Sequence, residues 1–169
     1  METKKLLQGK KVLIVDDEPD ILDTLTELLS VAMIDRASTF EEAKALLETE
    51  YYDVVVLDIM GVKGFELLQI AKEKDIPALM LTAHALNKES LKKSAEEGAS
   101  YYVPKDEISN IAVFVADVLE AREKGKNSWV RWFERLGGFF DENRRFSGPN
   151  WREEHKKFWD DKLKRLPGI

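Results

Sequence analysis

Short apolar runs alternating with segments of helical period are the feature that most limits what this chain can fold into. The run Val54-Val55-Val56-Leu57 contains no polar residue, which is typical of a strand buried on both faces of a parallel sheet. A weaker strand is predicted over 34–37, because Asp35 and Arg36 interrupt its apolar pattern. The remaining predicted strands cover residues 12–15, 78–81 and 101–103.

Apolar stripes at helical spacing lie between these runs and predict helices around residues 21–29, 40–47 and 65–71. A fourth helix is predicted from near Lys88, with Asn87 as its N-cap and Gly98 at its C-terminal end. A fifth is predicted from after Lys105 to about Lys124. The strand–helix unit is therefore repeated five times, and right-handed crossovers wind such a chain into a three-layer α/β sandwich.

Polar side chains follow the predicted strands where each strand ends. Because ligands of open α/β sheets bind beyond the carboxyl ends of the strands, we expect these residues to share one site. They are Asp16, Asp17, Asp58, Thr82 and Lys105. Three clustered carboxylates repel one another unless a cation joins them, and Mg²⁺ is the ion that combines few carboxylates with waters and phosphate oxygens. Thr82 and Lys105 then suit the remaining phosphoryl oxygens, although an isolated acidic residue at a strand end is more often a helix cap.

The segments VLIVDDEPDIL, VVVLDIM, ALMLTAHA and YYVPKD resemble the signature segments of the receiver domain of two-component response regulators, over residues 10 to about 122. The resemblance implies a flavodoxin-like fold with strand order 2-1-3-4-5. It also implies that Asp58 accepts a phosphoryl group from a sensor histidine kinase or phosphotransfer protein. Such a chain is a phosphoacceptor rather than an enzyme, with self-dephosphorylation left open.

The same resemblance implies roles for further residues. Asp16, Asp17, Asp58 and the main-chain carbonyl of Met60 would hold Mg²⁺. Thr82 and Lys105 are similar to the pair that detects phosphorylation, and Tyr102 occupies the position of the family's rotating aromatic residue, although an aromatic residue in a last strand is ordinarily part of the core.

The loop after Asp58 departs from the family pattern. It lacks the usual proline, and glycine follows at Gly64, so the loop is about two residues short. The surface that kinases contact beside the site is therefore expected to differ. His84, two residues after Thr82, either faces this site or lies on the surface.

Two other function classes share features with this one. A phosphate-independent interaction module with the receiver fold stays open. A phosphatase with an aspartate nucleophile is disfavoured, because Met60 stands where such enzymes resemble one another in having a second aspartate.

Composition limits the remaining options. The chain of 169 residues has no cysteine, which excludes disulfides and thiol chemistry, and no apolar run approaches the roughly 20 residues of a membrane span. The polar start resembles no signal peptide, so a cytoplasmic protein without membrane insertion is expected.

Residues 1–124 carry a net charge of −10 and residues 125–169 one of +4, and all the tryptophans lie in the second part. This change predicts a receiver body over 1–124 and an aromatic, basic helical tail over 125–169.

The tail is predicted to hold two short helices. Trp129, Trp132, Phe133 and Leu136 share one helical stripe, and Gly137-Gly138 is expected to end that helix. A second helix is predicted from a capping box at Asn150 to residue 166. Forty-five residues are few for a winged-helix module, which argues against DNA binding. Aromatic residues among basic ones could also stack on nucleic-acid bases, but burial against the body or a second copy fits the helical spacing better.

A docking surface for the tail is expected on the fifth predicted helix. Val113 and Phe114 fall outside its core stripe, so their apolar side chains need cover. We expect Trp129, Trp132 and Phe133 to provide it, in the same chain or in a homodimer. This output surface lies near the fourth and fifth predicted helices, where a change at Thr82 and Tyr102 would be felt.

Overall fold

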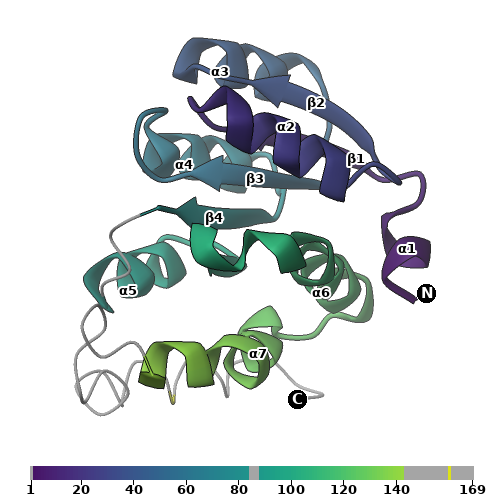
Figure 1. Ribbon diagram of the computed structural model, residues 1–169. Coiled ribbons are helices and arrows are strands. Elements are labelled where there is room, and N and C mark those ends of the chain that lie inside the picture. The colour runs from purple at the N-terminus through teal and green to yellow at the C-terminus, as the bar shows by residue number, and fades with distance from the viewer. Residues whose placement is uncertain (1, 84–87, 143–159, 161–169) are drawn as a thin grey trace.

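The central sheet of the computed structural model has five parallel strands in the order β2-β1-β3-β4-β5, as predicted (Figure 1). The structure describes residues 2–83, 88–142 and 160, without the side chains of 88 and 138–142. The strands are β1 (Lys11–Val15), β2 (Met33–Ala37), β3 (Val54–Asp58), β4 (Ala78–Thr82) and β5 (Tyr101–Pro104).

Helices cover both faces of this sheet. α2 packs beside α6 on one face, and α3 packs beside α4 on the other, with α5 next to α4. This arrangement confirms the three-layer α/β sandwich (Figure 1). The helices are α1 (Glu2–Leu7), α2 (Pro19–Leu28), α3 (Phe40–Thr49), α4 (Gly64–Glu73), α5 (Lys88–Glu96), α6 (Ile111–Lys124) and α7 (Ser128–Glu142), with a 3-10 turn, η1, over Lys105–Asn110.

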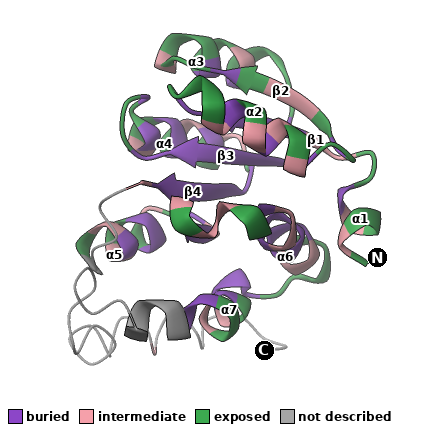
Figure 2. Ribbon diagram, in the orientation of Figure 1, coloured by how far each residue is buried: buried purple, intermediate pink, exposed green. Residues whose placement is uncertain are grey.

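The strands differ in burial as their sequences predict. Every residue of β3 and β4 is buried, whereas only Ala37 of the edge strand β2 is (Figure 2). The polar residues that weaken the β2 pattern have partners there: Asp35 accepts a 2.6 Å hydrogen bond from the Tyr52 hydroxyl, and Arg36 pairs with Asp23 at 2.9 Å. An edge strand with one open side tolerates such residues, which is why its apolar signal is weak.

Several boundaries differ from the sequence-based expectation. The fifth predicted helix is split into η1 and α6: Asn110, with φ of −101° and ψ of 14°, stands at their junction, and Glu107 inside η1 also departs from helical backbone angles. α1 was not predicted, since its six residues contain only Leu6 and Leu7 as large apolar residues and it is stabilised by packing against α6. α5 begins at Lys88 as predicted, and Gly98 has a positive φ after it. The predicted cap Asn87 and His84 lie outside the described residues.

The tail helix α7 is longer than predicted. It continues through Gly137-Gly138 to Glu142, so the prediction that these glycines end it is wrong. A glycine inside a helix costs only about 1 kcal/mol. The burial of Leu136 and Gly137 on the body compensates for that cost. The second predicted tail helix, over 150–166, lies outside the described residues apart from Asp160.

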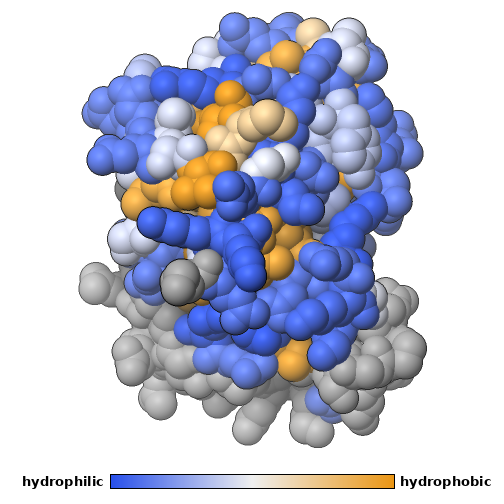
Figure 3. All heavy atoms as spheres, turned by 90° about the vertical axis from the view of Figure 1, so that its right-hand side faces the viewer, coloured by the Kyte–Doolittle hydropathy of each residue, from blue (hydrophilic) through white to orange (hydrophobic). Residues whose placement is uncertain are grey.

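The two ends of the sheet have different surfaces. Figure 3 views the molecule from the side of the amino ends of the strands, where apolar patches lie among hydrophilic side chains. The exposed large apolar residues near these ends are Val31, Met33 and Tyr51. Among the described residues, no helix is long and apolar enough to cross a membrane. The clustered carboxylates lie at the opposite, carboxyl ends.

Candidate phosphoacceptor site

The carboxyl ends of four strands bring the predicted site residues together. Asp16 directly follows β1, Asp58 ends β3 and Thr82 ends β4, and all three are nearly inaccessible at 0%, 4% and 2% exposure. Lys105 directly follows β5. The short apolar strands place these polar residues at one edge because the parallel register aligns their ends.

Lys105 is the positive centre of this group. Its Nζ lies 2.9 Å from Asp16 Oδ2, 3.1 Å from Glu18 Oε1 and 3.6 Å from Asp58 Oδ1. Burial lowers the pKa of Lys105, but its hydrogen bonds to Asp16 and Glu18 and the charge of Asp58 outweigh that effect and raise the pKa overall. Lys105 is therefore charged at neutral pH and ties β5 to β1 and β3.

Burial disfavours the charged forms of the Asp16 and Asp58 carboxyl groups. Burial and, after it, the charge of Asp16 raise the pKa of Asp58 to about 7, against the opposing effect of Lys105. Burial likewise raises the pKa of Asp16. One lysine thus offsets the mutual repulsion of these carboxylates only in part, and the site favours an additional cation or a proton.

The oxygen atoms present fit a hard divalent ion. Carboxylate oxygens of Asp16, Asp17 and Glu18 lie within 4.8 Å of one another. Among the described residues, the buried Asp16 Oδ2 has the Lys105 ammonium 2.9 Å away as an ion-pair partner and accepts no further hydrogen bond. A buried carboxylate oxygen with a single cationic partner, beside two further acidic groups, suits Mg²⁺, which takes oxygen ligands.

Thr82 and Tyr102 lie side by side behind the carboxylates. A side-chain hydrogen bond joins them, and the Tyr102 hydroxyl lies 2.5 Å from Ser90 Oγ of α5. Tyr102 is fully buried, and burial raises its pKa to about 12. Its ring therefore occupies the interior position, bonded to the strand end on one side and to α5 on the other.

The tail helix α7 covers the open edge of β5. Trp132 Nε1 donates to the main-chain oxygen of Tyr102 at 2.7 Å, and Trp129 Nε1 donates to the main-chain oxygen of Ala99 at 3.1 Å. Ser128 Oγ donates to the oxygen of Ser100 at 2.6 Å. Side chains of α7 thus satisfy main-chain acceptors that an edge strand leaves unpaired.

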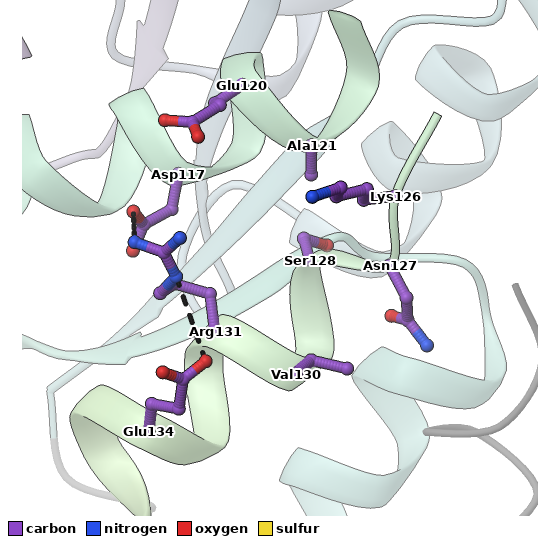
Figure 4. Close-up of a pocket in the computed structure, with 9 residues that line it drawn as sticks. All are labelled: Asp117, Glu120, Ala121, Lys126, Asn127, Ser128, Val130, Arg131 and Glu134. Carbon is purple, nitrogen blue, oxygen red and sulfur yellow. Dashed lines mark ion pairs between the residues drawn. The ribbon is translucent and has the colours of Figure 1, made fainter. Parts of the chain in front are cut away.

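An ion pair joins α7 to α6. Asp117, 7% exposed, accepts hydrogen bonds from Arg135 Nε at 2.5 Å and Nη2 at 3.1 Å, and from the Tyr101 hydroxyl at 2.8 Å. Figure 4 shows the adjoining hollow of about 170 Å³, where Arg131 reaches toward both Asp117 and Glu134. These charged side chains pair with one another, so the hollow is part of the seam between the two helices.

The predicted docking residues are therefore largely covered within one chain. Trp129 and Trp132 are buried and Phe133 is half-buried. Phe114 is buried and stacks on Tyr101 with ring centroids 5.5 Å apart, and Val113 is half-buried.

Three functional candidates were missed in the sequence. Glu18, exposed beside Asp17, bonds Lys105, and its place in the Asp-Asp-Glu run was an available signal. Asp117 interrupts the apolar run from Ile111 to Leu119, a pattern that indicates a paired buried charge. Its partner Arg135 carried no such signal.

Comparison with known proteins agrees with this geometry. Residues 12–115 match the family model described as response regulator receiver domain. The chain is 37% identical over 103 residues to the two-component response regulator ARR18 of Arabidopsis thaliana, and 46% identical over 88 residues to the probable transcriptional regulator ycf27 of Guillardia theta. These matches cover 57% and 49% of this chain but only 16% and 33% of the relatives.

Solved structures show the same fold. A CheY-like receiver domain protein from Methanospirillum hungatei JF-1 superposes with a TM-score of 0.63 at 27% identity, over 70% of this chain and 99% of that one. The BeF3-activated DrrB receiver domain superposes with a TM-score of 0.60 at 30% identity, over 67% of this chain and 99% of that one. DrrB is described as a response regulator of Thermotoga maritima.

Proposed function

Because the chain belongs to the response regulator receiver domain family, whose members are phosphorylation-dependent signalling domains, we propose that it is a switch with Asp58 as its phosphoacceptor. The observation that carries this proposal is the position of Asp58. Its buried carboxylate ends the central strand β3, 3.6 Å from Lys105 and beside Asp16. The nucleophile Asp58, the cation Lys105 and the acidic group Asp16, which can bind a further cation, therefore lie together.

The reaction is a phosphoryl transfer. A carboxylate oxygen of Asp58 forms a bond to phosphorus, and the bond from phosphorus to a histidine nitrogen of the kinase or phosphotransfer protein breaks. The electron pair of that bond stays on the imidazole nitrogen, which takes a proton from solvent. Lys105 is placed to attract the oxygens of the bound phosphoryl group, and Thr82 is placed to donate a hydrogen bond to one of them.

Asp16, Asp17, Asp58 and the main-chain carbonyl of Met60 would hold Mg²⁺, and Glu18 lies close enough to join them through water. When bound, the ion neutralises charge on the transferring group. Of the protein's own groups, Lys105 favours the ionised form of Asp58 against the burial that raises its pKa, and the surrounding residues exclude water from its buried side. The exposed Met60 side chain comes two residues after Asp58, and its bulk would restrict an attacking water there.

Phosphorylation would reach the surface through Thr82 and Tyr102. If the phosphoryl group draws the Thr82 hydroxyl toward it, the hydrogen bond from Thr82 to Tyr102 is lost. Tyr102 also holds α5 through Ser90 and accepts a hydrogen bond from α7 through its main-chain oxygen. The tail is thus the proposed output element, and its docking on α6 and β5, or dimerisation through the same surface, would shift between two states. We place this activity in the cytoplasm.

The test is labelling with acetyl phosphate and Mg²⁺, measured by intact mass. The chain should gain one phosphoryl group, and Asp58→Asn should gain none. Asp53→Asn is the matched control, because Asp53 lies just before the other end of β3, where it accepts a hydrogen bond from the Lys11 main chain. Labelling of Asp58→Asn at the parent's rate would exclude Asp58. An unlabelled parent would favour the phosphate-independent interaction module instead.

A further inference from the structure

The loop between β3 and α4 is short and closely packed against the site. Only residues 59–63 separate Asp58 from the first residue of α4, Gly64. Val62 is fully buried, and both Gly61 and Lys63 have left-handed backbone angles, with φ of +84° and +55°. The loop therefore crosses the carboxylate site with its main chain close to the acidic residues.

The main chain at Gly61 lies directly against the Asp17 carboxylate. A Cβ atom at position 61 would be 2.4 Å from Asp17 Oδ2, 2.7 Å from Cγ and 2.9 Å from Oδ1. All three separations are shorter than non-bonded atoms tolerate. Asp17 is exposed on its other side, so a methyl group at position 61 would turn this side chain away and leave the fold in place.

The next glycine fixes the loop at its other end. A Cβ atom at Gly64 would be 2.2 Å from the main-chain oxygen of Asp58 and 2.8 Å from Ile59 Cα. These are main-chain atoms of a buried strand end, which cannot turn aside. Gly64 also donates a 3.2 Å hydrogen bond to the oxygen of Ile59. The loop is thus held down on Asp58 at one end and reaches Asp17 in the middle.

From these contacts we infer that Gly61 is a positioning residue for the metal carboxylate: the shortened loop, held at Gly64, sets where the Asp17 side chain stands relative to Asp58. The inference rests on the proposed function, since it concerns the Mg²⁺ site of the phosphoacceptor. In the alternative, Gly61 only allows the turn its positive φ, and the position of the Asp17 side chain does not depend on it.

The primary test is Mg²⁺ affinity, measured by titration calorimetry and by amide shifts of site residues. Gly61→Ala should weaken Mg²⁺ binding about tenfold, the size of effect seen when groups that orient metal ligands are removed. Gly9→Ala and Gly125→Ala are matched controls, because both glycines have positive φ, +77° and +66°, and a Cβ there meets no atom within 4 Å. These controls should share the destabilisation that comes from placing alanine at positive φ, but not the part due to Asp17, and they should bind Mg²⁺ like the parent.

A double-mutant cycle tests the contact without any metal. In the Asp17→Ala background, Gly61→Ala should lower the thermal midpoint by less than it does in the parent, because the clashing carboxylate is absent. An equal loss in both backgrounds, with Mg²⁺ affinity of Gly61→Ala within twofold of the parent, would overturn the inference and leave the proposed function standing. A parent that bound no Mg²⁺ would overturn both.

Discussion

The indole nitrogen of Trp132 donates a 2.7 Å hydrogen bond to the main-chain oxygen of Tyr102. Trp132 belongs to the tail helix α7, and the hydroxyl of Tyr102 contacts Ser90 and Thr82 in the body. One residue of β5 is therefore bonded both to the end of the phosphoacceptor site and to the tail. A movement of this residue cannot leave both contacts unchanged.

Trp132→Phe keeps most of the buried ring but removes this bond. The Tyr102 oxygen would lose its hydrogen bond from the tail, at a cost of about 1–3 kcal/mol in the free energy of unfolding. We expect the change in tryptophan fluorescence on adding beryllium fluoride and Mg²⁺ to fall by at least half. Trp129→Phe removes the comparable bond to the Ala99 oxygen and should retain the response. Equal responses in both variants would show that Tyr102 does not transmit the signal through its main chain.

Asp117→Asn should weaken the attachment of α7 to α6. Removing one partner of a buried ion pair leaves the other uncompensated, and we expect a loss of about 3 kcal/mol in the free energy of urea unfolding. Glu120→Gln removes an exposed pair with Lys124 one turn away and should cost less than about 1 kcal/mol. A loss for Asp117→Asn no greater than that of Glu120→Gln would contradict the assigned role of this ion pair.

The pKa of Asp58 makes stability depend on pH in a defined direction. Its value is about 7 in the folded chain and near 4 in an unfolded one, so the folded state binds the proton more tightly and this group's contribution to stability falls as pH rises from about 4 to 7. Asp58→Asn, which stays neutral, should gain stability over the parent across this range. The gain should level off at about 2–4 kcal/mol above pH 8 in metal-free buffer. Urea unfolding at pH 5 and pH 8 measures it, and a gain that shrank with rising pH would refute the burial argument.

Magnesium should bind weakly in the absence of phosphate, and more weakly below pH 7, where it competes with the proton on Asp58. Asp17→Ala should abolish most of the Mg²⁺-dependent amide shifts around β1 and β3. Shifts that persisted unchanged in this variant would place the ion elsewhere. Asp20→Ala is a suitable control, because Asp20 is an exposed acidic residue in the first turn of α2.

Much of the fold follows from sequence because its signals are local. The uninterrupted apolar run of β3 predicts a strand buried on both faces. The apolar stripes of α2 to α4 predict which face of each helix packs on the sheet. Residues at the ends of parallel strands must meet, so Asp16, Asp58, Thr82 and Lys105 could be assigned to one site from strand order alone.

The differences arise where tertiary contacts outweigh local preference. α7 passes through Gly137-Gly138 because burial of Leu136 compensates for helix-breaking glycines. The six residues of α1 form a helix only with α6 to pack against. The approach of Gly61 to Asp17 depends on the path of a loop, which no periodicity in the sequence reveals.

The cover that α7 provides for β5 also bears on how the polypeptide behaves when it is shortened. A version ending at Lys124 would expose the main-chain oxygens of Ala99, Ser100 and Tyr102 to water and uncover the apolar surface beneath Trp129 and Trp132. A bare edge strand is a template on which a strand of another molecule can add. The receiver body without α7 is therefore expected to aggregate through β5, so the tail protects solubility whether or not it also carries a signal.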